Sequence, residues 1–360
     1  MAREWMSVIK MFPEEWLLED DNPPVKFLTM RDLLDYRVND SELIAANEAI
    51  ITYRPVRQIL KKQNSDGSWM SKDQPYLPKY KSSYWQVMLL AMFGMNRRNP
   101  QVESAANRLL AFQHPEGGFE THEATRKEYE FVRKRNLARK RGIPSYEEWA
   151  PLKYREMQMS CLTGNVCLAL IRLGYEHHEA VKKALQWLVK IQNVDGGWLC
   201  PYWGAHVNDK HGCFMGTITP LDAFSETPDD LMDADMRATI RQGAEFLLMH
   251  RLYMSDHHDL KVIKQSWLNL CFPQFFYDIL RGLAVLAKLG YSNDERIDDA
   301  LRIILKRQDD AGKWHSDCGY SGRLHGTIET KNEPSKWISL EALKVIRRAV
   351  QTRGHLELNE

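Results

Sequence analysis

The chain has 360 residues, of which 49 are Lys or Arg and 48 are Asp or Glu, so its formal net charge at pH 7 is +1. A surface so evenly balanced generates no field that would draw the whole molecule onto nucleic acid, which argues against general nucleic-acid binding. The first ten residues lack the apolar segment of a signal peptide, and no apolar run approaches the ~20 residues needed to cross a bilayer, so we expect a cytoplasmic protein.

A short phrase recurs along the chain, and its fullest form is Gln-Asn-Val-Asp-Gly-Gly-Trp at 192–198. Every copy keeps the Gln, a Gly four residues later and an aromatic residue six residues later. The copies begin at Gln63, Gln113, Gln192 and Gln308. Such a Gly suits a chain that leaves a helix through a positive φ angle, and the aromatic ring can pack back between helices. The phrase therefore predicts four turns, each held by a packed aromatic residue, and a degenerate fifth copy near His250.

The segments that flank the turns alternate between two kinds of helical pattern. Amphipathic stretches precede the turns, at 55–62, 102–112, 180–191, 238–249 and 297–307, and are expected to be outer helices. More uniformly apolar stretches follow them, at 83–94, 161–174, 213–224, 272–290 and 335–345, and are expected to be buried inner helices. Segments 5–12 and 25–35 can supply a sixth pair. We therefore predict one all-α domain over residues 1–360, built from helix pairs.

One segment breaks this period, because 79 residues separate Gln113 from Gln192 whereas 50 separate Gln63 from Gln113. The excess is a charged insertion at about 120–158. It contains two runs of three basic residues at 133–135 and 139–141, among acidic residues. We expect an exposed helix followed by a loop around Pro144 and Pro151. A solvated surface helix is one interpretation, and a lid or anion-binding arm is the other.

The turns and the alternating helices resemble the repeat of prenyltransferases and squalene cyclases, over residues 50–350. This resemblance implies an (α/α)6 toroid in which six helix pairs surround a central cavity. It also implies that the turn loops and the first residues of the inner helices share one mouth of that cavity. Members of this group act on hydrophobic, isoprenoid-type substrates, and protein prenyltransferases need a partner subunit. The Asp-x-Asp-Asp acid of class II terpene cyclases has no counterpart here, which argues against cyclisation initiated by that acid.

A cysteine-rich loop at 200–213 joins one turn to the start of an inner helix, and another Cys begins the preceding inner helix. Thiolates and imidazoles are the ligands that zinc prefers. We therefore predict a zinc site with the ligands Cys161, Cys200, His211 and Cys213. His325, in the last mouth loop, is an alternative imidazole. Buried cysteines can equally be small apolar side chains without a ligand role.

Two acidic residues on the inner helices, Asp222 and Asp278, are the candidate general acids, because burial would raise the pKa of a carboxyl group that faces the cavity. A buried ion pair with Arg281 or another cation is the alternative. The acidic run at 229–235 is interpreted as helix capping.

Aromatic residues near the starts of inner helices could line a pocket for an isoprenoid chain, although aromatic residues at helical spacing are also common in protein cores. The candidate substrate-binding residues are Tyr84, Trp85, Phe214, Phe272, Phe276, Tyr277 and Trp337. Cations near the mouth could bind a diphosphate, namely Lys79, Lys81, Lys210, Arg323 and Lys336.

The sequence thus favours a prenyltransferase-like or terpene-cyclase-like enzyme that holds a hydrophobic substrate, such as an isoprenoid diphosphate, in a central cavity. A mouth zinc would activate a nucleophile or act as a Lewis acid. The alternative is a non-catalytic toroid that binds a hydrophobic ligand or a protein. A helical-barrel carbohydrate enzyme using Asp222 and Asp278 ranks third. Peripheral membrane contact and a partner subunit stay open.

Overall fold

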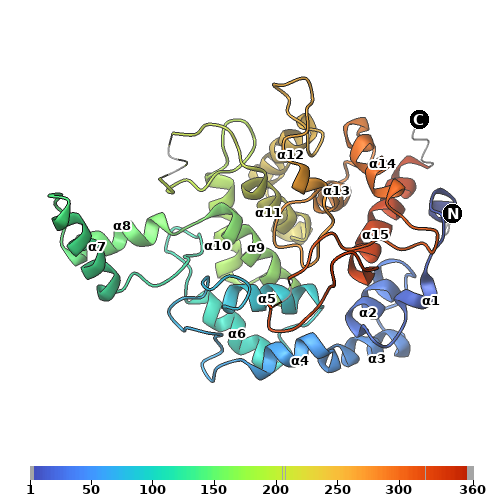
Figure 1. Ribbon diagram of the computed structural model, residues 1–360, viewed down its shortest axis with the longest axis horizontal. Helices are drawn as coiled ribbons and strands as arrows, with labels where there is room; N and C mark the ends of the chain where they lie inside the picture. Colours follow the sequence, from blue (N-terminus) through green and yellow to red (C-terminus); the bar gives the residue numbers. More distant parts are fainter. Residues whose placement is uncertain (1–3, 205, 207, 321, 355–360) are drawn as a thin grey trace. The chain divides into compact units, whose positions relative to one another are not determined.

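The computed structural model describes residues 4–204, 206, 208–320 and 322–354. All the regular elements in these ranges are helices, and the β-structure that they contain is limited to isolated bridges (Figure 1). The predicted all-α class is confirmed. Within the same residues, no helix is both long enough and apolar enough to span a bilayer.

Five pairs of helices follow one another along the chain. The first members are α4 (Arg54–Lys61), α6 (Pro100–Leu110), α10 (Glu179–Lys190), α12 (Ala234–Met249) and α14 (Asp298–Lys306). The second members are α5 (Ser83–Met92), α9 (Ser160–Leu170), α11 (Phe214–Ser225), α13 (Ile279–Lys288) and α15 (Lys336–Arg353). Ten of the 11 residues of α9 are buried, against five of the 12 residues of α10. The predicted alternation of one-sided and fully buried helices is therefore confirmed.

Each repeated turn is fixed to the buried helix that follows it. The backbone N–H of the turn's aromatic residue donates a hydrogen bond to a hydroxyl group in the first turn of that helix. The four pairs are Trp69 with Ser83 (2.9 Å), Phe119 with Thr163 (2.9 Å), Trp198 with Thr217 (3.0 Å) and Trp314 with Ser339 (2.9 Å). These bonds satisfy buried donors and place each turn at the N-terminal end of a buried helix.

The glutamine of each turn makes two further hydrogen bonds, both donated by its Nε2. One goes to the carbonyl of the turn's own glycine, and the other goes to a backbone carbonyl of another segment. The second acceptors are Gln101 for Gln63 (2.8 Å), Ala180 for Gln113 (2.7 Å), Thr239 for Gln192 (2.8 Å) and Met11 for Gln308 (2.7 Å). The first three acceptors lie in the next outer helix. The fourth lies in the N-terminal segment, which thus takes the place of a next outer helix.

The glycines of the turns are required for two reasons. Gly117 has a φ of +123°, which residues with a side chain rarely adopt. A Cβ atom added there would also lie 2.6 Å from the carbonyl oxygen of Lys183 in α10. The same close approach recurs at Gly312, where the added Cβ would lie 2.4 Å from the Met11 carbonyl oxygen. Glycine therefore allows each turn to touch the segment that its glutamine binds.

The chain divides into two compact units. The first comprises Met1–Lys62, Leu89–Asn96 and Ile240–Glu360, and includes α1 (Glu14–Leu17), α2 (Pro23–Asp32), α3 (Ser41–Ala49), α13, α14 and α15. The sequence predicted helices at 5–12 and 25–35. The structure has a 3-10 helix at Glu4–Val8 and places α2 near the second range, while α3 was not predicted.

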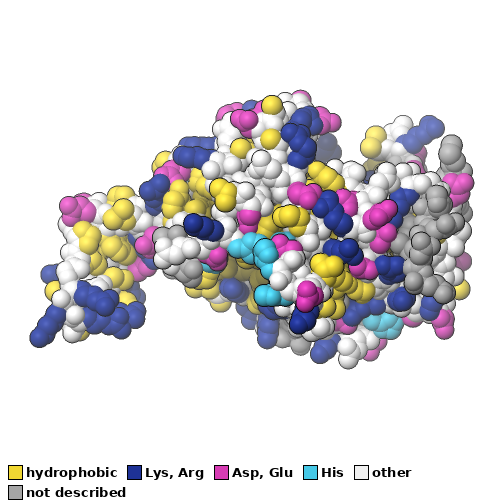
Figure 2. Space-filling view, turned by 90° about the horizontal axis from the view of Figure 1, so that it is seen from above, with side chains coloured by type: hydrophobic (Ala, Val, Ile, Leu, Met, Phe, Trp, Pro, Cys, Tyr) yellow, Lys and Arg dark blue, Asp and Glu magenta, His cyan; other side chains and the backbone are white. Residues whose placement is uncertain are grey.

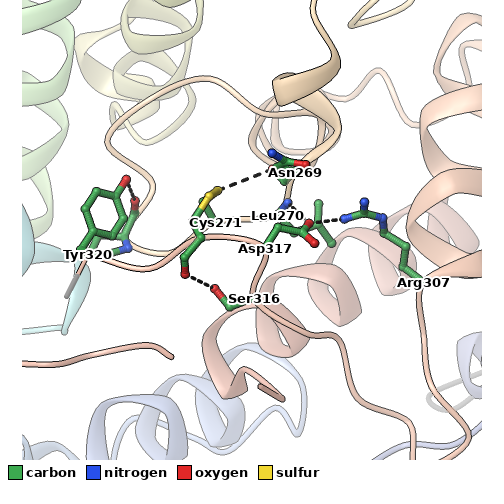
Figure 3. The surroundings of a disulfide bond; sticks show 9 residues. Asn269, Leu270, Cys271, Arg307, Ser316, Asp317 and Tyr320 are labelled. Atoms are coloured by element: carbon green, nitrogen blue, oxygen red, sulfur yellow. Dashed lines mark hydrogen bonds and ion pairs between the residues drawn. A yellow bond between two sulfur atoms is a disulfide. The ribbon is translucent and has the colours of Figure 1, made fainter. Parts of the chain in front are cut away.

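The loops before α13 and α15, both in the first unit, are joined covalently (Figure 3). Cys271 and Cys318 form a disulfide with a Cα–Cα distance of 5.2 Å. Beside it, the backbone N–H of Leu270 donates to Asp317 Oδ2 at 2.7 Å, and Asp317 pairs with Arg307. The buried helix predicted to begin at residue 272 begins only at Ile279, because Pro273 lies in the intervening segment and Asp278 caps the helix.

The second unit comprises Gln63–Met88 and Arg97–Thr239, and includes α6, α9, α10 and α11. Helices α9 and α11 pack closely at Gly164, where an added Cβ atom would lie 2.5 Å from the nitrogen of Pro220. The insertion forms two helices, α7 (Arg126–Ala138) and α8 (Tyr146–Glu156), which extend away from α9 and α10 (Figure 1). The loop predicted around Pro151 is wrong, because a capping box between Ser145 and Glu148 starts α8 and Pro151 lies inside it.

Candidate active site

Two cysteines that are 39 residues apart in sequence lie together in the second unit. Cys161 is the second residue of α9, and Cys200 follows the turn aromatic Trp198 by two residues. Ser160 Oγ lies 3.8 Å from Cys200 Sγ, and the thiol of Cys161 is hydrogen-bonded to Cys200. This bond lowers the pKa of Cys200 and raises that of Cys161, whose burial acts in the same direction. Cys200 is therefore the sulfur that ionises first, with Cys161 as its donor.

Cys213 approaches the same pair from α11. It is the N-cap of that helix, and its Sγ accepts a hydrogen bond from the Gly216 N–H at 3.5 Å. Its charge contributes to the raised pKa of Cys161, so the two side chains lie within electrostatic range. Because Cys213 N–H also donates to the Trp198 carbonyl at 2.9 Å, the turn and the helix start are held together. The structure thus brings Cys161 and Cys200 into contact and places Cys213 within electrostatic range of them, but the three sulfurs do not all lie within 4.8 Å of one another.

The fourth predicted ligand, His211, is held by a carboxylate. Its Nδ1 lies 3.1 Å from Asp195 Oδ2, which also accepts the Gly212 N–H at 2.6 Å. Another imidazole contacts the thiol segment directly, because His206 Nδ1 accepts the Cys200 N–H at 3.3 Å. Sequence reasoning selected His211 and not His206, because His211 lies two residues before Cys213.

The donor chemistry of this cluster fits a soft divalent metal. Three sulfurs, Cys161, Cys200 and Cys213, come from three separate segments, and one of them ionises readily. Structural and catalytic zinc sites use such thiolates together with imidazoles. His206 and His211 are the imidazoles of the adjoining loop. Bound zinc would supply a Lewis acid or an activated nucleophile at this position.

An aromatic group that the sequence only partly predicted lies beside the thiols. The ring of Trp85 in α5 lies 5.4 Å from that of Tyr76 and 5.1 Å from that of Tyr80. Burial raises the pKa of Tyr76, and the charges of Cys161 and Cys200 raise it further, so Tyr76 lies within electrostatic range of these sulfurs. Tyr76 and Tyr80 were missed because they lie in a loop without helical periodicity.

The neighbouring candidate Tyr84 has a different environment. It is fully buried, its ring packs edge-on against Phe112 and Phe119, and its hydroxyl donates to the Glu120 carbonyl at 2.7 Å. Burial raises the pKa of the Glu120 carboxyl to about 8, so this group is a protonated acid near neutral pH. Glu120 was not predicted, because its burial depends on the packing of a loop.

Asp222 and Phe214 lie at opposite ends of α11. Phe214 is its first residue and is buried beside Cys213 in sequence. Asp222 lies eight residues further along, or ~12 Å at 1.5 Å per residue, and its Oδ1 is 4.0 Å from Arg172 Nη2. Arg172 also binds Glu226 through two hydrogen bonds of 3.0 and 2.7 Å. Asp222 therefore lies beside a cation, as the alternative interpretation of the sequence, an ion pair, expected.

The acidic run at 229–235 has the capping role that the sequence indicated. Asp233 Oδ1 accepts a hydrogen bond from the Met236 N–H at 2.8 Å, at the start of α12.

In the first unit, four aromatic side chains form a cluster. Phe272 stacks on Trp337 with ring centroids 4.2 Å apart and planes 4° from parallel. The ring of Phe93 lies 5.4 Å from that of Trp337, and Tyr53 packs edge-on against Phe93 at 5.5 Å. The structure thus brings together two of the predicted aromatic residues, Phe272 and Trp337, and adds Tyr53 and Phe93. The last two lie outside the predicted helix starts.

The other predicted aromatic residues of this unit, Tyr277 and Phe276, have different surroundings. Tyr277 is buried and its hydroxyl donates to the Leu252 carbonyl, while Phe276 is 38% exposed. Lys336, predicted as a diphosphate ligand, is buried and pairs with Glu19 and Asp21. A structural ion-pair network therefore accounts for its charge.

Two carboxyl groups of the first unit are partly or wholly protonated at neutral pH. Burial raises the pKa of Asp278 to about 7, although its Oδ1 caps α13 by accepting the Arg281 N–H at 2.8 Å. Burial also raises the pKa of Glu329 to about 7, against the opposing effect of a hydrogen bond with Ser335. The charge of Glu329 also raises the pKa of Tyr53 in the aromatic cluster. A general acid acts from this protonated state.

Comparison with known proteins gives only distant matches. No family model matches the chain, and no curated protein matches it. The chain is similar to type II terpene cyclase MstE from Scytonema, at 14% sequence identity and a TM-score of 0.45, over 92% of this chain and 89% of that one. A variant of that cyclase in complex with its substrate geranylgeranyl dihydroxybenzoate gives 15% identity and a TM-score of 0.44, over 92% and 88% of the two chains.

A protein from Actinoplanes is similar at 14% identity and a TM-score of 0.42, over 93% of this chain and 90% of that one. These values are too low to transfer a reaction or a residue role. The proposals below therefore rest on the residues of this chain.

Proposed function

We propose that this protein is an enzyme that acts on a hydrophobic, isoprenoid-type substrate at the thiol cluster of its second unit, with zinc bound by Cys161, Cys200 and Cys213. The observation that carries the proposal is the contact between Cys161 at the start of α9 and Cys200 after the turn, with Cys213 at the start of α11 within electrostatic range of them. The repeated turns, which resemble those of prenyltransferases and squalene cyclases, support the substrate class.

The surroundings of the thiols suit an isoprenoid diphosphate. Tyr76 and Tyr80, which are half-buried and pack on the buried Trp85, offer ring surfaces for an unsaturated chain or for a carbocation formed from it. Lys79 Nζ lies 5.7 Å from the centre of the Tyr76 ring and is exposed, so a cation is available beside these rings for a diphosphate. The resident groups would therefore hold both ends of such a substrate.

The metal is tested by elemental analysis of the full-length protein purified without added metal. We expect about one zinc per chain in the unaltered protein and a loss of zinc in Cys200→Ser. The matched control is Cys167→Ser, which removes a fully buried thiol of α9 that lies outside the cluster and should leave the zinc content unchanged. Substoichiometric zinc in the unaltered protein would remove the metal from the proposal.

The substrate class is tested separately by titrating farnesyl and geranylgeranyl diphosphate while Trp fluorescence and melting temperature are recorded. We expect binding that weakens about fivefold in Tyr76→Ala, since a stacked aromatic contributes about 1 kcal/mol. Products are then sought by mass spectrometry. Binding without conversion would instead support the non-catalytic alternative, and the absence of any response would count against an isoprenoid ligand.

A further inference from the structure

The insertion folds as a hairpin with a core of its own, and we call residues 126–156 the arm. The rings of Tyr129, Tyr146 and Trp149 contact one another with centroids 5.4 to 6.2 Å apart. The Tyr129 hydroxyl donates to the Pro144 carbonyl and the Tyr146 hydroxyl to the Ala124 carbonyl, each at 2.8 Å. The hairpin therefore fixes which side chains its outer surface presents.

The outer surface of the arm is strongly basic in a chain whose net charge is +1. Residues 126–141 contain eight basic and two acidic side chains. Arg126 pairs with Glu147 at 2.8 Å and Arg133 with Glu130 at 3.3 Å. The other six are exposed and have no ion pair with any residue that the structure describes, namely Lys127, Lys134, Arg135, Arg139, Lys140 and Arg141. The positive charges in such a cluster repel one another, and binding of an anionic partner reduces this repulsion.

Large apolar side chains are exposed on the same arm. The exposed fractions are 68% for Phe131, 56% for Leu137 and 60% for Leu152. Figure 2 shows hydrophobic side chains beside a dense group of Lys and Arg side chains on this arm, at the left of the view.

Phe131 lies at the centre of a basic face. It follows the inward-facing Tyr129 by two residues, which places it about 200° around the helix from that ring. Lys127 lies four residues before Phe131, and Lys134 and Arg135 lie three and four residues after it, so all three share its face. The core of the hairpin already contains its own aromatic residues, so Phe131 is left without a packing partner there.

We propose that the arm binds the surface of an anionic lipid bilayer, with Phe131 inserted at the boundary of the acyl chains and the six basic side chains contacting the headgroups. Helices that lie in a membrane interface combine an apolar face with Lys and Arg in this way. Each basic residue near an anionic surface strengthens binding about fivefold, and salt screens the attraction. A nucleic acid would satisfy the charges but would leave the exposed Phe131 ring in water. The inference is independent of the thiol cluster and of its substrate.

The test is co-sedimentation of the full-length protein with vesicles of phosphatidylcholine alone and of phosphatidylcholine with phosphatidylserine, at 0.1 M and higher salt. We expect binding to the anionic vesicles that decreases with salt, and at least about tenfold weaker binding for the double variant Lys134→Glu, Arg135→Glu. Its control is Lys61→Glu, Lys62→Glu, which makes the same change in net charge at exposed positions of α4 and its C-cap, off the arm.

The apolar contribution is tested with Phe131→Gln, which should weaken binding about tenfold at constant charge, whereas Val194→Gln, at a fully exposed position off the arm, should not. Circular dichroism confirms that each variant is folded. Absence of vesicle binding, or binding that the two arm variants leave unchanged, would overturn the proposal. Binding of an RNA or DNA oligonucleotide that depends on Lys134 and Arg135, without any binding to vesicles, would overturn the proposal as well.

Discussion

Asp278 shows how two effects act on one carboxyl group. Its side chain caps α13, which stabilises an ionised carboxylate, and its complete burial raises its pKa to about 7, which favours the neutral acid. Burial has the same effect on Glu120 and Glu329. The sequence predicted Asp278 as a buried acid because it placed this residue on a buried inner helix. Glu120 and Glu329 lie in loops, where no pattern in the sequence reports burial.

The raised pKa of Asp278 makes stability depend on pH. Between the ordinary value of 3.8 and about 7, the group is protonated in the folded protein and ionised in the unfolded chain. The folded state then binds more protons, so the free energy of unfolding falls as pH rises through this interval and levels off above it. At about 1.4 kcal/mol per pKa unit, the loss is on the order of a few kcal/mol.

The substitution Asp278→Asn should remove this dependence, because Asn keeps the capping acceptor but cannot ionise. Relative to the unaltered protein, the variant should gain free energy of unfolding steadily between pH 4 and pH 7 and no further above pH 8. Urea denaturation at several pH values measures the difference, in which the contributions of Glu120 and Glu329 cancel. A difference that stays constant with pH would show that Asp278 keeps an ordinary pKa.

At the scale of elements, the repeated turn was the most informative part of the sequence. The Gln, the Gly and the aromatic residue of the turn each make a separate contact, so the repeated phrase indicated where helices end and begin. The predictions from the sequence were wrong or incomplete for segments that make no such contact. The helix α3 has a weak apolar pattern, and Pro151 was taken as a helix breaker although the capping box at Ser145 outweighs it. The same difference applies to the site. Cys161, Cys200 and Cys213 were predicted because they lie at turns and helix starts, whereas Tyr76 was missed because it lies in an irregular loop.

The disulfide between Cys271 and Cys318 was also missed, because pairing depends on two loops meeting that are 47 residues apart. A cross-link that closes a loop of this length should stabilise the folded protein by about 4 kcal/mol through the unfolded state. Cys318→Ser should therefore lower the free energy of unfolding by up to that amount under oxidising conditions. The double variant with Cys271→Ser should lose no more than the single one. Denaturant unfolding with and without reductant checks both, and a single variant as stable as the oxidised protein would show that no disulfide forms.

For the whole molecule, the last turn shows how the series of helix pairs ends. A repeat protein normally has a terminal unit with an uncovered face, which a capping segment must cover. Here Gln308 makes to the N-terminal segment the contact that the other turns make to the next outer helix. It accepts the Lys10 N–H at its Oε1 (2.7 Å) and donates to the Met11 carbonyl (2.7 Å). The first residues of the chain thus cover its last repeat.

The substitution Gln308→Ala should release this cover without disturbing the other turns. It removes the acceptor of Lys10 N–H and the donor to Met11, and each lost buried hydrogen bond costs on the order of 1 kcal/mol. Hydrogen exchange followed by mass spectrometry should show faster exchange at residues 8–12, and chiefly there. Gln113→Ala is the matched control, because it breaks the equivalent bonds to Gly117 and Ala180 and should leave residues 8–12 protected. If both variants, or neither, exposed residues 8–12, the N-terminal segment would be held by its apolar contacts, such as that between Trp5 and Phe12, and the glutamine would not be its specific anchor.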